Sequence, residues 1–121
     1  MLTSVCTGSW VYARMGLLDG LPATNRKEPD RVESGPSGQV PIDRLAELAP
    51  ACRISRARVV DAGRIVTAGG ISSGMEMGLH LLGRAGYSQE FVSEVARVME
   101  YTAAYELYRD DVEVVVTAPA Q

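Results

Sequence analysis

The stretch Leu2-Thr3-Ser4-Val5-Cys6-Thr7-Gly8-Ser9 decides the fold of this chain. Its first four residues suit the end of a buried strand, and its last three open a helix predicted to run to about Met15. Cys6 therefore stands at a strand-to-helix turn, with the small residues Ser4 and Gly8 two places to either side. A sharp turn needs small residues there, because larger side chains would collide where strand and helix approach.

Such a turn lifts the Cys6 thiol to the edge of a sheet and places it over the N-terminus of a helix. The unpaired N–H groups and the dipole of that helix favour a thiolate, so Cys6 is a candidate nucleophile. The backbone N–H groups of Thr7 and Gly8 are candidates for binding an oxyanion. The alternative is a buried structural cysteine, since free cysteine is among the most buried residue types. The second cysteine, Cys52, suits that structural role better.

A second turn is predicted at residues 69–74, after a hairpin formed by residues 58–61 and 64–68. Its glycines, Gly69 and Gly70, permit a tight turn, but the Gly-Lys-Ser/Thr ending of a phosphate loop is missing. In an open α/β sheet, turns at the carboxyl ends of strands line the ligand crevice. We therefore expect Gly69 and Gly70 to share one pocket with Cys6.

A helix is predicted over residues 73–84, with Gly74, Gly78 and Leu82 on the face that lies on the sheet. Glu76 in its first turn either complements the helix dipole or supplies a carboxylate to the Cys6 pocket. We expect His80 and Arg84 to form a polar helix face, with His80 at the surface or in packing rather than as a base.

A further helix is predicted from its cap at Ser88 to about Tyr108. Its expected buried positions are Phe91, Val95, Val98, Met99 and Thr102. The stripe of Tyr101, Tyr105 and Tyr108 favours core packing or a dimer contact over ligand stacking.

Strands alternating with helices predict an α/β fold with a parallel-type sheet and flanking helices. Residues 23–25 suit a short strand, residues 43–49 a short helix, and residues 26–41 a flexible surface loop. We assign residues 1–108 to one domain and residues 109–121 to a C-terminal tail, in which residues 112–117 are either an edge strand or part of the tail. The strands are too few for a complete parallel sheet, which is buried on both faces.

The composition excludes several function classes. The 121 residues carry 12 basic and 15 acidic side chains, for a net charge of −3, which gives no electrostatic footprint for nucleic acid. The sequence shows no membrane-spanning run, and a single histidine excludes a His-rich metal site. Two thiols without a signal peptide suggest a reducing, cytoplasmic location.

Several ordered motifs resemble the ThiJ/PfpI family, which is related to class I glutamine amidotransferases. The matching segments are Val5-Cys6-Thr7-Gly8-Ser9-Trp10, Gly16-Leu17-Leu18-Asp19-Gly20, Ala23-Thr24, residues 66–77 and Met99-Glu100-Tyr101. The last two segments resemble the isonitrile-hydratase-like branch. The resemblance covers the C-terminal half of such a domain.

The resemblance implies a flavodoxin-like three-layer sandwich, a homodimer and a cysteine nucleophile that works without a metal or organic cofactor. In the isonitrile-hydratase-like branch, water is added to an isonitrile to give an N-substituted formamide. The cysteine and the following threonine take part, which carries over onto Cys6 and Thr7. Glu76 stands where the branch usually has aspartate. Two departures are the missing half, with its acidic partner for the cysteine, and Asn25 and Arg26 in a region where many members have histidine.

Three functions follow as hypotheses: a cysteine-dependent hydratase, hydrolase or amidotransferase-like enzyme acting on a small molecule, a non-catalytic ligand-sensing or regulatory domain, and a remnant that associates with another chain. Some relatives of this domain are fused to DNA-binding modules, but this sequence has no basic patch. Size-exclusion behaviour distinguishes the third hypothesis, since a well-behaved monomer would contradict it.

Overall fold

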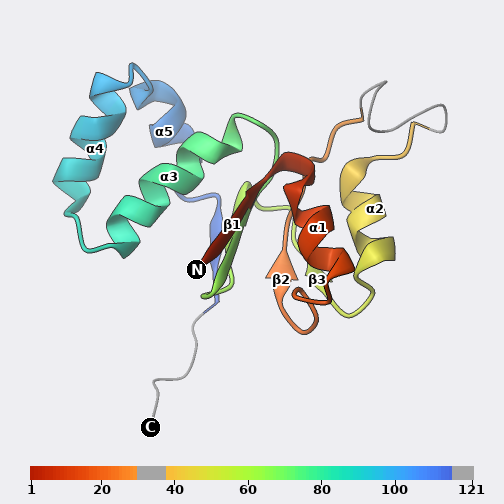
Figure 1. The fold of residues 1–121 in the computed structure, drawn as a ribbon. Helices are drawn as coiled ribbons and strands as arrows, with labels where there is room; N and C mark the ends of the chain where they lie inside the picture. Colours follow the sequence, from red (N-terminus) through yellow and green to blue (C-terminus); the bar gives the residue numbers. More distant parts are fainter. Residues whose placement is uncertain (30–37, 116–121) are drawn as a thin grey trace, which may run out of the picture.

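The computed structural model describes residues 1–29 and 38–115 of the chain (Figure 1). Residues 30–37 of the predicted loop and residues 116–121 of the predicted tail lie outside the described residues. The elements of the described part follow in chain order: β1 (Leu2–Val5), the 3₁₀ turn η1 (Cys6–Gly8), α1 (Ser9–Arg14), β2 (Pro22–Ala23), α2 (Pro41–Leu48), β3 (Arg53–Ile54), β4 (Val59–Asp61), β5 (Ile65–Ala68), α3 (Ser73–Arg84), α4 (Gln89–Val98), α5 (Thr102–Tyr108) and β6 (Val112–Val114).

The main sheet has four strands in the order β1-β5-β4-β6. β1 and β5 are parallel, β4 and β5 form the predicted antiparallel hairpin, and β6 runs parallel to β4 at the edge. Of the two alternatives for this C-terminal stretch, the structure has the edge strand. A second sheet pairs β2 with β3, each of two residues. Two residues are too few to show a strand's alternation of polar and apolar side chains, so the sequence does not predict β3.

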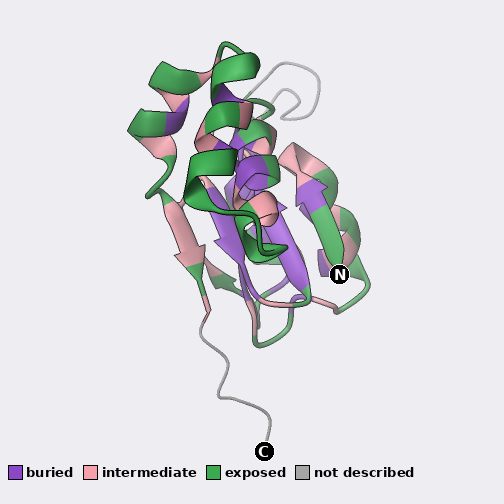
Figure 2. Ribbon diagram, turned by 90° about the vertical axis from the view of Figure 1, so that its left-hand side faces the viewer, coloured by how far each residue is buried: buried purple, intermediate pink, exposed green. Residues whose placement is uncertain are grey.

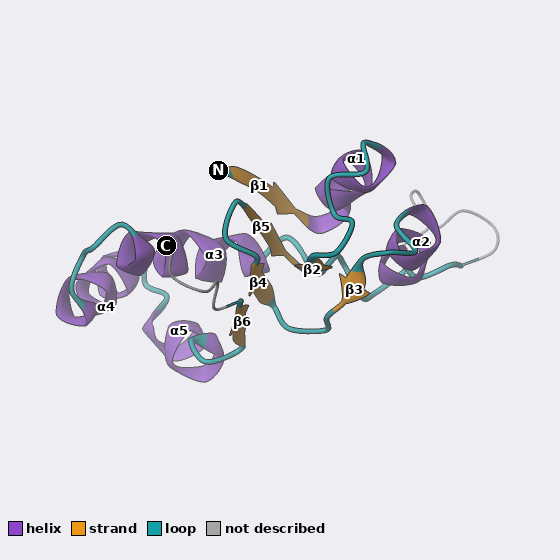
Figure 3. Ribbon diagram, turned by 90° about the horizontal axis from the view of Figure 1, so that it is seen from below, coloured by secondary structure: helices purple, strands orange, loops and turns teal. Residues whose placement is uncertain are grey.

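Helices cover both faces of the main sheet, as Figures 1 and 3 show. On one face, α3 packs through Met77 onto Val59, Val66 and Ala68 of the strands. On the other face, Ile65 belongs to a core shared with α1, α2 and the small sheet, which also contains Cys52. Cys52 is thus the buried structural cysteine that the sequence predicts. Figure 2 shows the buried strands behind α3, α4 and α5, whose outer surfaces are mostly exposed.

The helix α3 has the bounds that the sequence predicts, but it turns a different face to the sheet. Gly74 does allow a close approach, since a Cβ there would lie 3.3 Å from a methyl group of Val5. Gly78 is exposed, and the expectation that it packs on the sheet is wrong. Met77 and Leu81 take that role because they follow Gly74 at three and seven residues, which is the spacing of one helix face.

The single helix predicted to run to about Tyr108 is two helices, α4 and α5. The chain breaks at Glu100, which has a φ of 55°, and the Tyr101 N–H bonds the Ala96 carbonyl at 2.8 Å. This pattern is a Schellman ending, here formed without glycine, so the sequence carries no clear stop signal. Of the described helices, none is long and apolar enough to cross a membrane.

The buried face of α4 also differs from the prediction. Val92 and Ala96 are buried against Leu79 and Tyr105. Phe91, Val98 and Met99 are instead exposed, by 44%, 69% and 44%. The periodicity of α4 fits either set of positions nearly as well. The helix turns its smaller side chains inward, toward α3 and α5, which both pack against it.

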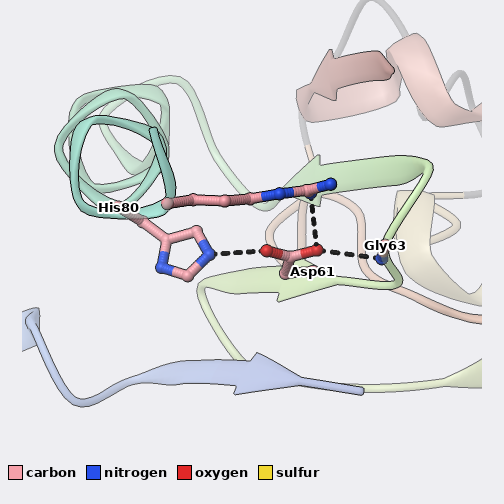
Figure 4. A network of polar contacts seen from close by, with 4 residues as sticks. Asp61, Gly63 and His80 are labelled. Atoms are coloured by element: carbon pink, nitrogen blue, oxygen red, sulfur yellow. Dashed lines mark hydrogen bonds and ion pairs between the residues drawn. The ribbon is translucent and has the colours of Figure 1, made fainter. Parts of the chain in front are cut away.

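A buried carboxylate ties the far end of β4 to α3 (Figure 4). Asp61 accepts hydrogen bonds from the Gly63 N–H at 2.9 Å and from Arg84 at 3.0 Å, and its other oxygen lies 2.8 Å from His80 Nε2. Burial alone would raise the pKa of Asp61, but the bonds from His80 and Gly63 and the charge of Arg84 together lower it. His80 and Arg84 thus form the predicted polar face of α3, and both bind Asp61, a partner that the sequence does not predict.

We expect this carboxylate to make the fold sensitive to acid. Because the pKa of Asp61 is lower in the folded chain, its charge stabilises the fold above about pH 4, and this contribution is lost as the pH falls through the lowered value. Asp61→Asn should cost about 1–3 kcal/mol at neutral pH and much less in acid. The urea midpoint measured across pH checks this, with the exposed Glu94→Gln as control. An equal loss at every pH would contradict the prediction.

Candidate functional site

Cys6 occupies a strained turn between β1 and η1. Its φ is 60°, in the left-handed region that residues other than glycine rarely adopt. The structure around it must hold this conformation, and strained residues of this kind cluster at functional sites. The Cys6 N–H donates to the Gly69 carbonyl at 2.7 Å, so the strand β5 fixes the turn from the side. The thiol is half-buried and forms no disulfide.

The small residues around Cys6 lie close together. A Cβ added at Gly8 would lie 3.4 Å from the Cβ of Ser4, which is contact distance, so the start of the helical segment lies close to β1. Gly8 then leads into α1, so Cys6 and Thr7 lie at the N-terminal end of a helical segment. The backbone N–H groups of Thr7 and Gly8 begin this segment, and their role in binding an oxyanion stays a prediction.

The two turns are neighbours, because the Cys6 N–H donates to the Gly69 carbonyl. That they share one pocket stays a prediction. Gly70 follows at the mouth of a surface pocket. The connection after β2 joins the same edge: the Thr24 N–H donates to Thr67 Oγ1 at 3.0 Å, and Asn25 Nδ2 donates to Ser9 Oγ at 2.8 Å. These buried bonds position the residues that follow Asn25 beside the two turns.

Glu76 is buried, and its two carboxylate oxygens are engaged away from Cys6. One accepts from Arg58 at 3.1 Å, and the other accepts a short hydrogen bond from the Tyr101 hydroxyl. Burial and the bond to Glu76 raise the pKa of Tyr101 to about 12, so its hydroxyl keeps the proton. The structure thus joins Cys6, Thr7, Gly8, Gly69 and Gly70 at one edge, while it holds Glu76 in a separate network. A proton-carrying role for Glu76 stays a prediction.

A pocket of about 350 Å³, which we call the cationic pocket, opens beside the glycine turn. Four basic residues line it, Arg26, Lys27, Arg56 and Arg58, together with the start of α3 and the carboxylates Glu28 and Asp111. The sequence does not predict this pocket, because its basic residues come from two segments that lie far apart in the chain.

Lys27 reaches back over the glycine turn. Its ammonium donates to Thr24 Oγ1 at 3.0 Å and to the Asn25 carbonyl at 3.2 Å. A Cβ at Gly69 would lie 2.7 Å from Lys27 Nζ, so glycine at this position makes room for the ammonium. Gly69 therefore touches Cys6 through its carbonyl and Lys27 through its Cα. Within residues 1–29 and 38–115, no three His, Cys, Asp or Glu side chains gather closely enough to hold a metal ion.

Comparison with known proteins identifies the fold. A DJ-1 superfamily protein from Salmonella typhimurium, solved as a cysteine-to-alanine mutant, matches with a TM-score of 0.62 at 20% identity over 84% of this chain and 46% of its own. A ThiJ/PfpI family protein from Pseudomonas syringae matches with a TM-score of 0.61 at 20% identity over 90% of this chain and 48% of its own. The predicted α/β, flavodoxin-like architecture is therefore confirmed.

Sequence comparison gives a different kind of relative. The HTH-type transcriptional regulator GbdR from Pseudomonas aeruginosa is 32% identical over 101 residues, which is 83% of this chain and 24% of the regulator. The chain thus spans about a quarter of the curated relatives it matches and about half of the solved structures. No family model matches the sequence.

The strain at Cys6 predicts an unusual response to glycine. Cys6→Gly should be more stable than Cys6→Ala by about 1 kcal/mol, because only glycine adopts a φ near 60° without cost. Urea unfolding of both variants measures the difference. At the exposed, helical Ala103, glycine should instead destabilise by about 1 kcal/mol. A Cys6→Gly variant less stable than Cys6→Ala would show that the turn is unstrained.

Proposed function

We propose that this chain is part of a ThiJ/PfpI-like domain in which Cys6 is the nucleophile. The observation that carries the proposal is the left-handed backbone of Cys6 at the carboxyl end of β1, directly before a helical segment. This arrangement presents the thiol at the edge of the sheet and puts backbone N–H groups beside it. The shared fold with DJ-1 and ThiJ/PfpI proteins supports the same assignment.

The proposed chemistry is the hydration of an isonitrile. The Cys6 thiolate attacks the terminal carbon and forms a C–S bond, and that carbon takes up a proton, which gives a thioimidate. Water then adds to the same carbon, and the C–S bond breaks to release an N-substituted formamide and the thiol. The N–H groups of Thr7 and Gly8 would stabilise the anion that forms at each addition. Related cysteine-dependent hydrolysis would use the same groups.

The geometry limits which residue can transfer the proton. Glu76 already accepts hydrogen bonds from Arg58 and Tyr101, so carrying a proton for Cys6 would require breaking one of them. The Thr7 hydroxyl belongs to the residue that directly follows the nucleophile in the chain. We therefore assign proton delivery to Thr7 and keep Glu76 as the second candidate.

A ligand-sensing domain is the alternative function. The match to a transcriptional regulator, at 32% identity over 101 residues, favours it. A sensor needs a pocket but no nucleophile, so the reactivity of Cys6 separates the two functions.

We expect Cys6 to be alkylated by iodoacetamide at least tenfold faster than Cys52 at neutral pH, a margin of about 1.4 kcal/mol. Cys52 is 9% exposed, and burial raises the pKa of its thiol, which disfavours the reactive thiolate. Peptide mass spectrometry of the native chain measures both sites at once, with the unfolded chain as control. Equal rates in the folded chain would remove the support for a nucleophilic Cys6.

The hydratase assignment predicts that the chain converts an alkyl isonitrile to the corresponding formamide, followed by proton NMR. Cys6→Ser should lose about a hundredfold or more of this activity because the hydroxyl is a weak nucleophile. Thr7→Val should lose less, and Thr7→Ser should retain activity if the hydroxyl carries the proton. Rapid alkylation of Cys6 without any turnover would favour the ligand-sensing alternative.

A further inference from the structure

The cationic pocket combines features that point to a ligand. Lys27 and Arg56 line it, and among the described residues no carboxylate forms an ion pair with either side chain. Arg58 is different, because Glu76 neutralises it at 3.1 Å. Because both side chains line the same hollow, their positive charges add there.

The environment of Lys27 shows that this charge is held at a cost. Its ammonium rests on two neutral oxygens, those of Thr24 and Asn25. Burial lowers the pKa of Lys27, and the charge of Arg56 lowers it further, against the opposing effect of Asp111. A half-buried charge that its surroundings disfavour gains more from a bound counter-charge than a fully exposed lysine would.

The backbone adds a positive end to the same hollow. Gly70, Ser72 and Ser73 line the pocket where α3 begins, and α3 has 12 residues. The positive end of the helix dipole therefore faces the pocket. Ser72 is also held in place, because its hydroxyl accepts from Arg58 at 3.2 Å. Arg58 in turn lies over the Tyr108 ring, 3.8 Å from its centre, so this wall of the pocket is rigid.

We propose that the cationic pocket binds a small molecule through an oxyanion group, a carboxylate or a phosphate, held between Lys27, Arg56 and the start of α3. The two acidic residues of the lining, Glu28 and Asp111, limit the negative charge that a bound ligand can carry. With four basic residues and with Arg58 neutralised by Glu76, the lining suits a ligand carrying one or two negative charges. Gly69 would place such a ligand next to the Cys6 turn, since Gly69 contacts both Cys6 and Lys27.

Titration of the ¹⁵N-labelled chain with inorganic phosphate and, separately, with acetate tests this proposal at constant ionic strength. The amide signals of Gly70, Ser72 and Ser73 should shift in a saturable way with at least one of the two anions. Saturation by phosphate alone assigns a phosphate-bearing ligand, and saturation by acetate assigns a carboxylate. No saturable shift with either anion would overturn the proposal.

Variants locate the binding. Lys27→Gln and the exposed Arg56→Gln should each weaken binding about tenfold or more, as expected for the loss of a charge-assisted hydrogen bond. Lys27→Arg should restore most of it. Arg97→Gln is the matched control, because Arg97 pairs with Glu94 on α4 away from the pocket. If Arg97→Gln weakens binding as much as Lys27→Gln, the effect is general screening and the proposal fails. Alkylation of Cys6 tests the proposed function by a separate readout, so either idea can fail alone.

Discussion

The parallel pairing of β1 with β5 is the constraint on which the site depends. The register runs from Leu2 opposite Ile65 to Val5 opposite Ala68, and it ends with the Cys6 N–H on the Gly69 carbonyl. Parallel strands finish at the same edge of a sheet, so the two turns that follow them must be neighbours. This hydrogen bond between Cys6 and Gly69 also holds Cys6 in its left-handed backbone conformation, which an isolated turn would not keep. The strain at Cys6 is therefore sustained by the pairing of the strands.

The strand β5 also positions the segment that contains Thr24 and Lys27, on the other side of the site. The Thr67 hydroxyl accepts a hydrogen bond from the Thr24 N–H. This buried bond fixes the path of the segment that leads through Asn25 to Lys27. Buried polar groups of this kind are costly unless they are paired, which makes the path of the segment specific. The Lys27 ammonium then lies against Gly69, where a side chain would leave it no room. The Cys6 turn and the half-buried Lys27 ammonium thus share a support at Gly69.

The sequence predicts the parts of this arrangement that depend on local patterns. The turn at Cys6, the hairpin and the bounds of α3 follow from residue size, β-branched runs and glycine, all within a few positions. The face of α3 that contacts the sheet was not predictable, because a helix face that contains Gly74 can include either Met77 or Gly78. The break at Glu100 was not predictable, because it lacks a glycine. The partners of Glu76 lie 18 and 25 residues away, beyond any local pattern. Lys27 was missed for the same reason, since its role depends on contact with Gly69.

The network around Glu76 gives the cationic pocket its selectivity. If Glu76 were absent, Arg58 would add a further unneutralised cation to the lining, and the pocket would favour more highly charged anions. Glu76 is 2% exposed and pairs with Arg58, so it removes that charge without entering the pocket itself. The bond from Tyr101, whose hydroxyl keeps its proton, orients Glu76 toward Arg58. Breaking a buried pair leaves an uncompensated charge, so this wall resists rearrangement when an anion arrives. The pocket is thereby set for a ligand of low charge before the ligand binds.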